Sequence, residues 1–153
     1  MKDSNKSTFI PVNSNYEHEV RSSFNAQGIM QLLGATMRTV EPGYCVIDLP
    51  FNPQLTQQDG YFHAGSTSAI ADSAGGYAAY SLMPAGHRVL TVEFKINLLA
   101  PADGELLSAE GTVIKAGRTL SAATIKVHCT KNSKTTLCAI MQQTTICIAP
   151  LGN

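Results

Sequence analysis

The sequence contains little charge for its length. Asp, Glu, Lys and Arg make up 14% of the 153 residues, against roughly 25% in ordinary soluble domains. Its 11 basic and 11 acidic residues give a formal net charge of zero, so there is no basic field to attract nucleic acid or an anionic membrane surface. Sparse charge also indicates that part of the surface is covered, and we expect a homo-oligomer.

Metal, disulfide and membrane signals are absent as well. No two of the four cysteines have CxxC spacing, and each lies in a strand-like run, which indicates buried, reduced thiols. His18, His87 and His128 form no metal-binding pattern with a cysteine or an acid. No apolar run is long enough to span a bilayer, and residues 1–15 lack the apolar centre of a secretory leader. We therefore expect a cytoplasmic protein with no metal and no membrane or nucleic-acid partner.

Composition divides the chain into a predicted flexible tail, residues 1–15, and one domain, residues 16–153. Apolar spacing predicts a helical segment at 16–33 that is broken at Gly28 and ended by Gly34. Six strands are predicted, at 35–40, 44–51, 90–98, 105–115, 119–130 and 135–148. In the third strand, one dry face is expected, formed by Leu90, Val92, Phe94, Ile96 and Leu98.

The remaining segment, residues 65–82, predicts a long helix of small side chains. A helix that is apolar all round is buried on most of its faces. Gly75 and Gly76 each destabilise a helix interior by about 1 kcal/mol relative to alanine, so we expect another element to approach closely there. The fold class is therefore α+β, with a long central helix wrapped by an antiparallel sheet of about six strands.

Asp72 is the one charged residue in this helix. Aspartate is rarely buried without a partner, and nothing else in the helix can pair with it. A carboxylate in such surroundings can act as a general base or as a nucleophile. The helix begins after Gln57 and His63, where Ala64 and Gly65 offer free backbone N–H groups that could stabilise an oxyanion. The alternative interpretation is a structural carboxylate that caps a loop or binds a neighbouring strand.

Five short motifs connect the chain with a known family: His63-Ala64-Gly65, Ala71-Asp72-Ser73, Leu90-Thr91-Val92-Glu93-Phe94, Pro101-Ala102 and Gly117-Arg118-Thr119-Leu120. Together they resemble the hotdog-fold acyl-CoA thioesterases of the PaaI-like (phenylacetate-pathway) group, over about residues 28–148. The chain departs from the family pattern at two positions. Gln57 stands where many relatives have Asn, and Ala64 replaces the first Gly of His-Gly-Gly, although alanine keeps the backbone N–H.

The resemblance implies hydrolysis of acyl-CoA to a free acid and CoA, with no cofactor beyond the CoA of the substrate. It implies that Asp72 acts as base or nucleophile, that Gln57 and Thr91 position the water, and that His63 lies at the site. It also implies a homodimer or homotetramer whose sites combine Gln57, His63 and Ala64 of one subunit with Asp72 and Thr91 of another. The implied substrate-binding residues are Gly65, Lys115, Gly117, Arg118, Thr119 and Leu120, and a guanidinium such as that of Arg118 suits phosphate.

Several alternatives remain open from the sequence. Each candidate residue also has a structural interpretation, such as Thr91 as a strand former and Arg118 as a solvated turn residue. The domain could be a non-catalytic module that binds acyl-CoA or acyl-carrier protein, because one fold hosts many functions. A thioester hydratase is a third possibility. The acyl group is also open, since Tyr77, Tyr80 and Leu98 suit aromatic and aliphatic groups equally.

Overall fold

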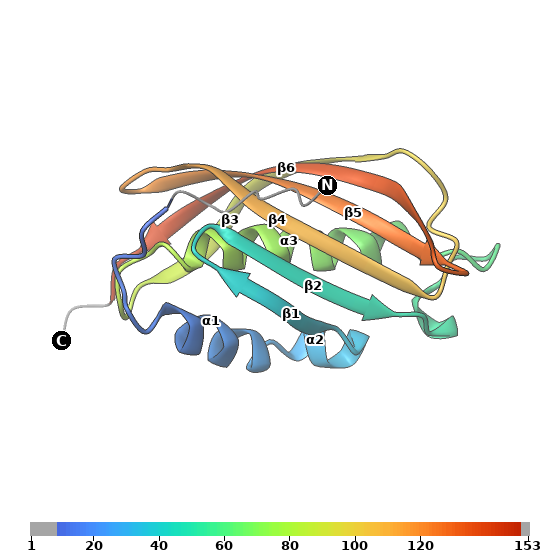
Figure 1. Ribbon diagram of the computed structural model, residues 1–153, viewed down its shortest axis with the longest axis horizontal. Coiled ribbons are helices and arrows are strands. Elements are labelled where there is room, and N and C mark those ends of the chain that lie inside the picture. The colour runs from blue at the N-terminus through green and yellow to red at the C-terminus, as the bar shows by residue number, and fades with distance from the viewer. Residues whose placement is uncertain (1–8, 151–153) are drawn as a thin grey trace.

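Six antiparallel strands form one sheet in the order β1-β2-β4-β5-β6-β3 in the computed structural model, which describes residues 9–150. The sheet arches over a long helix, α3 (Ala64–Tyr80), as Figure 1 shows. This arrangement confirms the predicted α+β hotdog architecture. The strands are β1 (Thr36–Glu41), β2 (Tyr44–Pro50), β3 (Arg88–Leu98), β4 (Leu106–Ala116), β5 (Leu120–Lys131) and β6 (Lys134–Ile148).

Two short helices precede the sheet, and the first of them contacts β1 (Figure 1). They are α1 (Tyr16–Asn25) and α2 (Gly28–Leu33), so Gly28 begins the second helix. Gly34 ends it with a φ of 76°, a left-handed conformation that favours glycine. Of the predicted tail, residues 1–8 lie outside the described part, whereas Phe9 packs against the core and Asn13 is buried. None of the helices in residues 9–150 is long and apolar enough to cross a membrane.

Small residues let the sheet touch the backbone of α3. A Cβ at Gly75 would overlap the side chains of Gln143 and Ile125, and a Cβ at Gly111 of β4 would overlap the backbone of Ala74. The close approach expected at Gly75 is therefore confirmed. At Gly76 the expected close approach is wrong, because a Cβ there would meet no atom of another element within 4 Å.

The edge strand β3 differs from its prediction in two ways. A register shift between Thr91 and Glu93 places Thr91 opposite Thr145, and Phe94 opposite Gln143. Since residues paired across antiparallel strands share a face, Thr91 and Phe94 lie on the same side of the sheet, and Leu90 lies on the other. The strict alternation expected from Leu90 to Leu98 is therefore wrong.

The second difference concerns burial. Leu90, Val92 and Leu98 are each more than half exposed, at 58%, 56% and 56%, and Phe94 is exposed as well. Of the five residues predicted to form a dry face, only Ile96 is partly buried. A strand edge with this many exposed apolar side chains is the kind of surface that pairs with another chain.

Candidate active site

The first backbone donor of α3 is free. His63 precedes the helix, and its Nδ1 accepts a hydrogen bond of 2.8 Å from the N–H of Gly65. The N–H of Ala64, the first helical residue, has no acceptor within residues 9–150. Because a helix N-terminus carries a partial positive charge, this N–H is suited to donate to a carbonyl oxygen or an oxyanion.

The backbone N–H of Gly65, unlike that of Ala64, is not a free donor. The Gly65 N–H is already donated to His63, so it does not project into open space. A Cβ at Gly65 would lie 3.0 Å from the His63 Nδ1, which is tighter than ordinary contact. With Nδ1 as the acceptor, the Nε2 of His63 is the ring nitrogen left to contact a ligand.

The side chain of Gln57 organises the loop before the helix. Its Oε1 accepts hydrogen bonds from the backbone N–H of Asp59 and, at 3.4 Å, of Tyr61. Its Nε2 donates to the Asp59 carboxylate at 3.3 Å. One hydrogen of the amide therefore remains for a ligand, while the carbonyl oxygen is committed to the loop.

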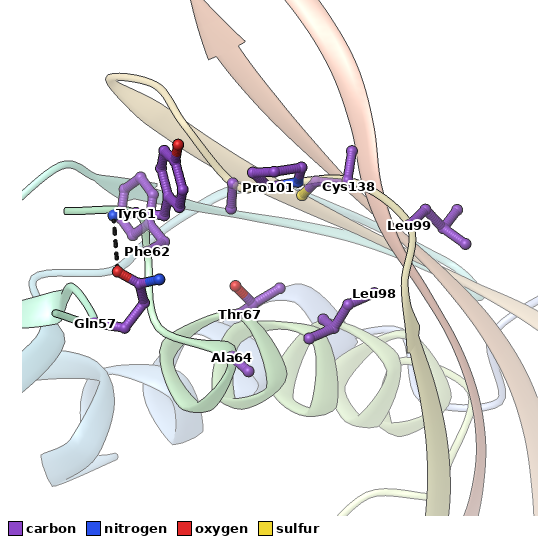
Figure 2. Close-up of a pocket in the computed structure, with 11 residues that line it drawn as sticks. Gln57, Tyr61, Phe62, Ala64, Thr67, Leu98, Leu99, Pro101 and Cys138 are labelled. Atoms are coloured by element: carbon purple, nitrogen blue, oxygen red, sulfur yellow. Dashed lines mark hydrogen bonds between the residues drawn. The ribbon is translucent and has the colours of Figure 1, made fainter. Parts of the chain in front are cut away.

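Ala64 and Gln57 border a cavity of about 450 Å³, drawn in Figure 2. Aromatic and aliphatic side chains supply most of the lining, with Tyr61, Phe62 and Leu98 among them. Open apolar space beside a free backbone donor fits a carbonyl that carries an apolar substituent. Leu98, predicted as a pocket residue, lies in this cavity.

Asp72 lies on the next turns of α3 in a hydrogen-bonded cluster. Its Oδ1 accepts 2.7 Å from the Thr91 hydroxyl and 2.6 Å from the Nε2 of Gln143. Its Oδ2 has no partner within the described residues. One carboxylate oxygen is thus held in place and the other is free to take a proton or to attack a carbonyl.

The sequence-based reasoning missed Gln143. It lies on β6 and is 1% exposed, which is unusual for glutamine. Besides Oδ1, its Nε2 contacts the backbone carbonyl of Asp72 at 3.0 Å and the Thr91 Oγ1 at 3.1 Å. The only signal in the sequence is the Gln142-Gln143 pair within an apolar strand. Only the strand pairing determines which member faces the helix.

Asp72 and Thr91 border a second cavity of about 260 Å³, together with Gly76 and Tyr77. The lining residues of the two cavities do not overlap. Tyr80 borders neither of them and instead contacts the Tyr77 ring, with 6.4 Å between ring centroids. Thr91 thus contacts Asp72, whereas Gln57, His63 and Ala64 lie at the other group, and the water-positioning roles of Gln57 and Thr91 stay predictions.

Distance along the helix separates these groups. Ala64 and Asp72 are eight residues apart in α3, which is about 12 Å at 1.5 Å per residue. A carbonyl carbon under attack must lie within about 3–3.5 Å of its nucleophile. Within one chain, the Asp72 carboxylate therefore cannot act on a carbonyl held by the Ala64 N–H.

The predicted CoA-contacting residues form the exposed hairpin between β4 and β5. At this turn the Gly117 N–H donates 2.9 Å to the carbonyl of Leu120. Leu120 pairs with Ile146, which in turn pairs with Leu90, so the hairpin lies at the Thr91 end of the sheet. The structure thus places the predicted hairpin residues together, two strands away from Thr91 at the same end of the sheet; they are Lys115, Gly117, Arg118, Thr119 and Leu120.

The cysteines and histidines do not offer a different chemistry. Cys45, Cys129 and Cys138 are buried, as predicted, whereas Cys147 is only partly buried. Burial raises the pKa of Cys45 to about 12 and that of Cys138 to about 11, which keeps both protonated and unreactive at neutral pH. In residues 9–150 no group of three or more His, Cys, Asp or Glu side chains is placed to hold a metal ion.

A family model described as the thioesterase superfamily matches residues 59–136, the segment that holds α3 and most of the sheet. The chain belongs to this family. A structure of a thioesterase family protein from Silicibacter pomeroyi is 42% identical, has a TM-score of 0.87, and is matched over 88% of this chain and 98% of that one. Thioester hydrolysis is accordingly the reaction class of the family to which this site belongs.

Two further relatives agree with this assignment. The Escherichia coli PaaI protein of the phenylacetic acid degradation operon has a TM-score of 0.78 at 19% identity, over 89% of this chain and 95% of that one, and supports the fold alone. A 1,4-dihydroxy-2-naphthoyl-CoA hydrolase of Listeria monocytogenes is 26% identical, over 65% of the chain described here and 81% of the hydrolase. The resemblance to PaaI-like hotdog proteins is confirmed.

Proposed function

We propose that this protein hydrolyses acyl-CoA thioesters, and that each active site combines the two groups described above from two copies of the chain. The observation that carries the proposal is that the chain presents two complementary groups. One is a free oxyanion donor, the Ala64 N–H, and the other is the Asp72 carboxylate, whose Oδ2 has no partner in the described residues. Family membership and the similarity to a CoA-thioester hydrolase support the reaction class.

In the proposed reaction the Ala64 N–H donates to the thioester carbonyl oxygen. Asp72 Oδ2 takes a proton from water while the water oxygen attacks the carbonyl carbon. The negative charge that develops on the carbonyl oxygen lies at the positive end of α3. The C–S bond then breaks, the CoA sulfur takes the proton that Asp72 had removed from water, and the free acid and CoA are released. Direct attack by Oδ2, giving a mixed anhydride that water hydrolyses, uses the same geometry and yields the same products.

The separation of about 12 Å between Ala64 and Asp72 supports a site shared between two copies. In a twofold dimer whose α3 helices run antiparallel, the Ala64 end of one helix would lie beside Asp72 of the other. The exposed apolar side chains of β3, including Leu90, Val92 and Phe94, provide a surface that such a dimer would bury. A dimer of dimers, the proposed tetramer, would need a further surface.

For the CoA portion we propose the β4–β5 hairpin. Arg118 and Lys115 are exposed there and supply positive charge at the Asp72 end of the sheet. A guanidinium can donate two parallel hydrogen bonds to a phosphate. The apolar side chains of Ile114 and Leu120, which are also exposed, would contact the pantetheine arm or the adenine ring.

The test is release of free thiol from a panel of short, medium, long and aromatic acyl-CoA thioesters, with the wild-type protein beside Asp72→Asn. The asparagine keeps the shape of the side chain and the acceptor oxygen but removes the base. We expect turnover on at least one thioester and a fall in kcat on the order of 10²–10⁴-fold in the variant. Unaltered turnover in a folded Asp72→Asn oligomer contradicts the role of Asp72. Tight acyl-CoA binding with no thiol release by the wild-type protein favours the binding module instead.

A further inference from the structure

The buried amide of Gln143 serves no evident purpose in the core. Its Oε1 is one of the three buried side-chain oxygen or nitrogen atoms in residues 9–150 that have no hydrogen-bond partner. A buried acceptor without a donor destabilises a fold, and an apolar side chain of the same length would avoid this cost. The Nε2 end, by contrast, is fully engaged, and two of its three contacts are to Asp72.

Gly75 provides the space that this amide occupies. A Cβ at that position would overlap the Gln143 Oε1 and the end of Ile125. Gly75 lies three residues after Asp72, so the two positions are adjacent on one face of α3. The helix thus lacks a side chain where the amide enters, at the cost of a glycine in a helix interior.

Gln143 and Thr91 restrain the same oxygen of Asp72. The Thr91 hydroxyl donates its single hydrogen to Asp72 Oδ1 and accepts a hydrogen bond from Gln143 Nε2 at 3.1 Å. Gln143 Nε2 contacts both Oδ1 and the backbone carbonyl of Asp72, which ties the side chain to its own helix turn. The rotation of the carboxylate about its χ angles is thereby limited, and Oδ2 is directed away from both donors.

We propose that Gln143 is a positioning residue for the hydrolysis, which selects Oδ2 of Asp72 as the reacting oxygen by holding Oδ1. This inference rests on the proposed function, because it assigns to Gln143 a role that is exerted through Asp72. Misplacement of a catalytic group by about 1 Å costs about a hundredfold in rate. Loss of the amide should therefore lower kcat without weakening substrate binding.

The decisive variant is Gln143→Met, which keeps the length of the side chain and removes both polar ends. We expect kcat to fall about tenfold to a hundredfold, with KM and the Kd of a non-hydrolysable CoA thioether within about twofold of wild type. The melting temperature should change little, because removal of the unpartnered Oε1 offsets the loss of the Nε2 hydrogen bonds to Asp72. Gln143→Asn, whose shorter amide cannot reach Oδ1, should show the same loss and serves as the second variant if methionine disturbs folding.

Thr145→Val is the matched control. Thr145 lies two residues along β6 on the same buried face, and its Oγ1 also has no partner. Valine has nearly the same shape, so this variant should keep wild-type kcat. If Thr145→Val lowers kcat as much as Gln143→Met does, the effect is general to buried polar groups of β6 and the inference is overturned.

A double-mutant cycle separates this inference from the proposed function. If Gln143 acts through Asp72, adding Gln143→Met to Asp72→Asn should change the residual kcat by less than about twofold. Full additivity overturns the inference, as does a folded Gln143→Met enzyme with wild-type kcat beside a collapsed Asp72→Asn. Wild-type turnover in Asp72→Asn overturns the proposed function itself, and the positioning role with it.

Discussion

Thr91 and Asp72 are joined by a hydrogen bond of 2.7 Å between side chains that lie 19 positions apart in sequence, one on the edge strand and one on the central helix. The bond exists because the register shift in β3 turns Thr91 toward α3. The hydroxyl uses its only hydrogen in this bond, so towards a water molecule it can act only as an acceptor. We propose that this hydroxyl orients the carboxylate and, through its remaining lone pair, the water.

Replacing Thr91 should therefore separate its donor function from its shape. Thr91→Val keeps the branched side chain that suits a strand but removes the donor to Oδ1, and we expect kcat to fall about tenfold to a hundredfold. Thr91→Ser, which keeps the hydroxyl, should retain most of the activity. Steady-state thiol release on the best thioester measures both. Equal activity in the valine and serine variants contradicts the orienting role.

The oxyanion donor can be removed with a single substitution. Ala64 is the first residue of α3, and His63 before it is extended with ψ near 143°, so proline fits the backbone at Ala64. Ala64→Pro deletes the N–H without breaking the helix, and kcat should fall on the order of 10²–10³-fold. Ala64→Gly keeps the N–H and should stay within a few-fold of wild type. A fully active Ala64→Pro enzyme with native circular dichroism would show that this N–H is not the donor.

The exposed apolar strand should control assembly. Phe94→Glu places a charge on β3 where a second copy would bury the ring, and burying an unpaired charge is strongly unfavourable. We expect the variant to sediment as a folded monomer and to lose turnover. Lys126→Glu changes the charge of an exposed residue on the central strand β5 and should leave assembly intact. An active Phe94→Glu monomer contradicts a site shared between copies.

Arg118 should affect binding more than chemistry. Arg118→Gln removes the charge from the β4–β5 hairpin, and loss of a charge-assisted contact that is present in both the ground state and the transition state raises KM without lowering kcat. We expect KM for acyl-CoA to rise about tenfold, with a weaker salt dependence. An acyl thioester of N-acetylcysteamine, which lacks the phosphates, should be hydrolysed equally by both proteins. Loss of kcat on that short thioester would contradict the assignment.

Stability should fall in alkali because of the buried thiols. Burial raises the pKa of Cys45 from 9.0 to about 12, so above pH 9 the unfolded chain releases a proton that the folded chain keeps. The contribution of the protonated Cys45 thiol to the free energy of unfolding is fully present below pH 9. Above pH 9 it falls by about 1.4 kcal/mol per pH unit, up to the pKa of the folded state. Urea unfolding of wild type and Cys45→Ala from pH 8 to 10.5 measures it. A stability difference between the two that does not change with pH contradicts the burial effect.

Local sequence signals predicted the elements of the fold well. Gly34 ends α2 in the left-handed region, and the predicted turns lie between the observed strands. The small side chains of residues 65–82 indicated a helix in close contact with a sheet, and Gly75 meets that expectation. These features depend on periodicity and on glycine, which act over a few residues, so the sequence alone carries them.

The details of the site depend on pairing between distant strands. The register shift at Val92 places Leu90 and Phe94 on opposite faces of the sheet. No residue type in β3 predicts this shift. Gln143 was missed because a glutamine pair in a strand places one member on each face, and only its register opposite Phe94 turns Gln143 toward Asp72. Thr91 was found through family resemblance, which carries the three-dimensional arrangement that local patterns lack.

The most direct test of the shared site is complementation between two inactive variants. Ala64→Pro and Asp72→Asn are each expected to be inactive alone, and the two should be mixed under mild denaturation and refolded together. In a mixed dimer, one site combines Ala64 of the Asp72→Asn chain with Asp72 of the Ala64→Pro chain and is intact. Random pairing should restore about a quarter of the wild-type activity. No restoration, although mass spectrometry detects mixed dimers, would mean that Ala64 and Asp72 do not meet across two chains.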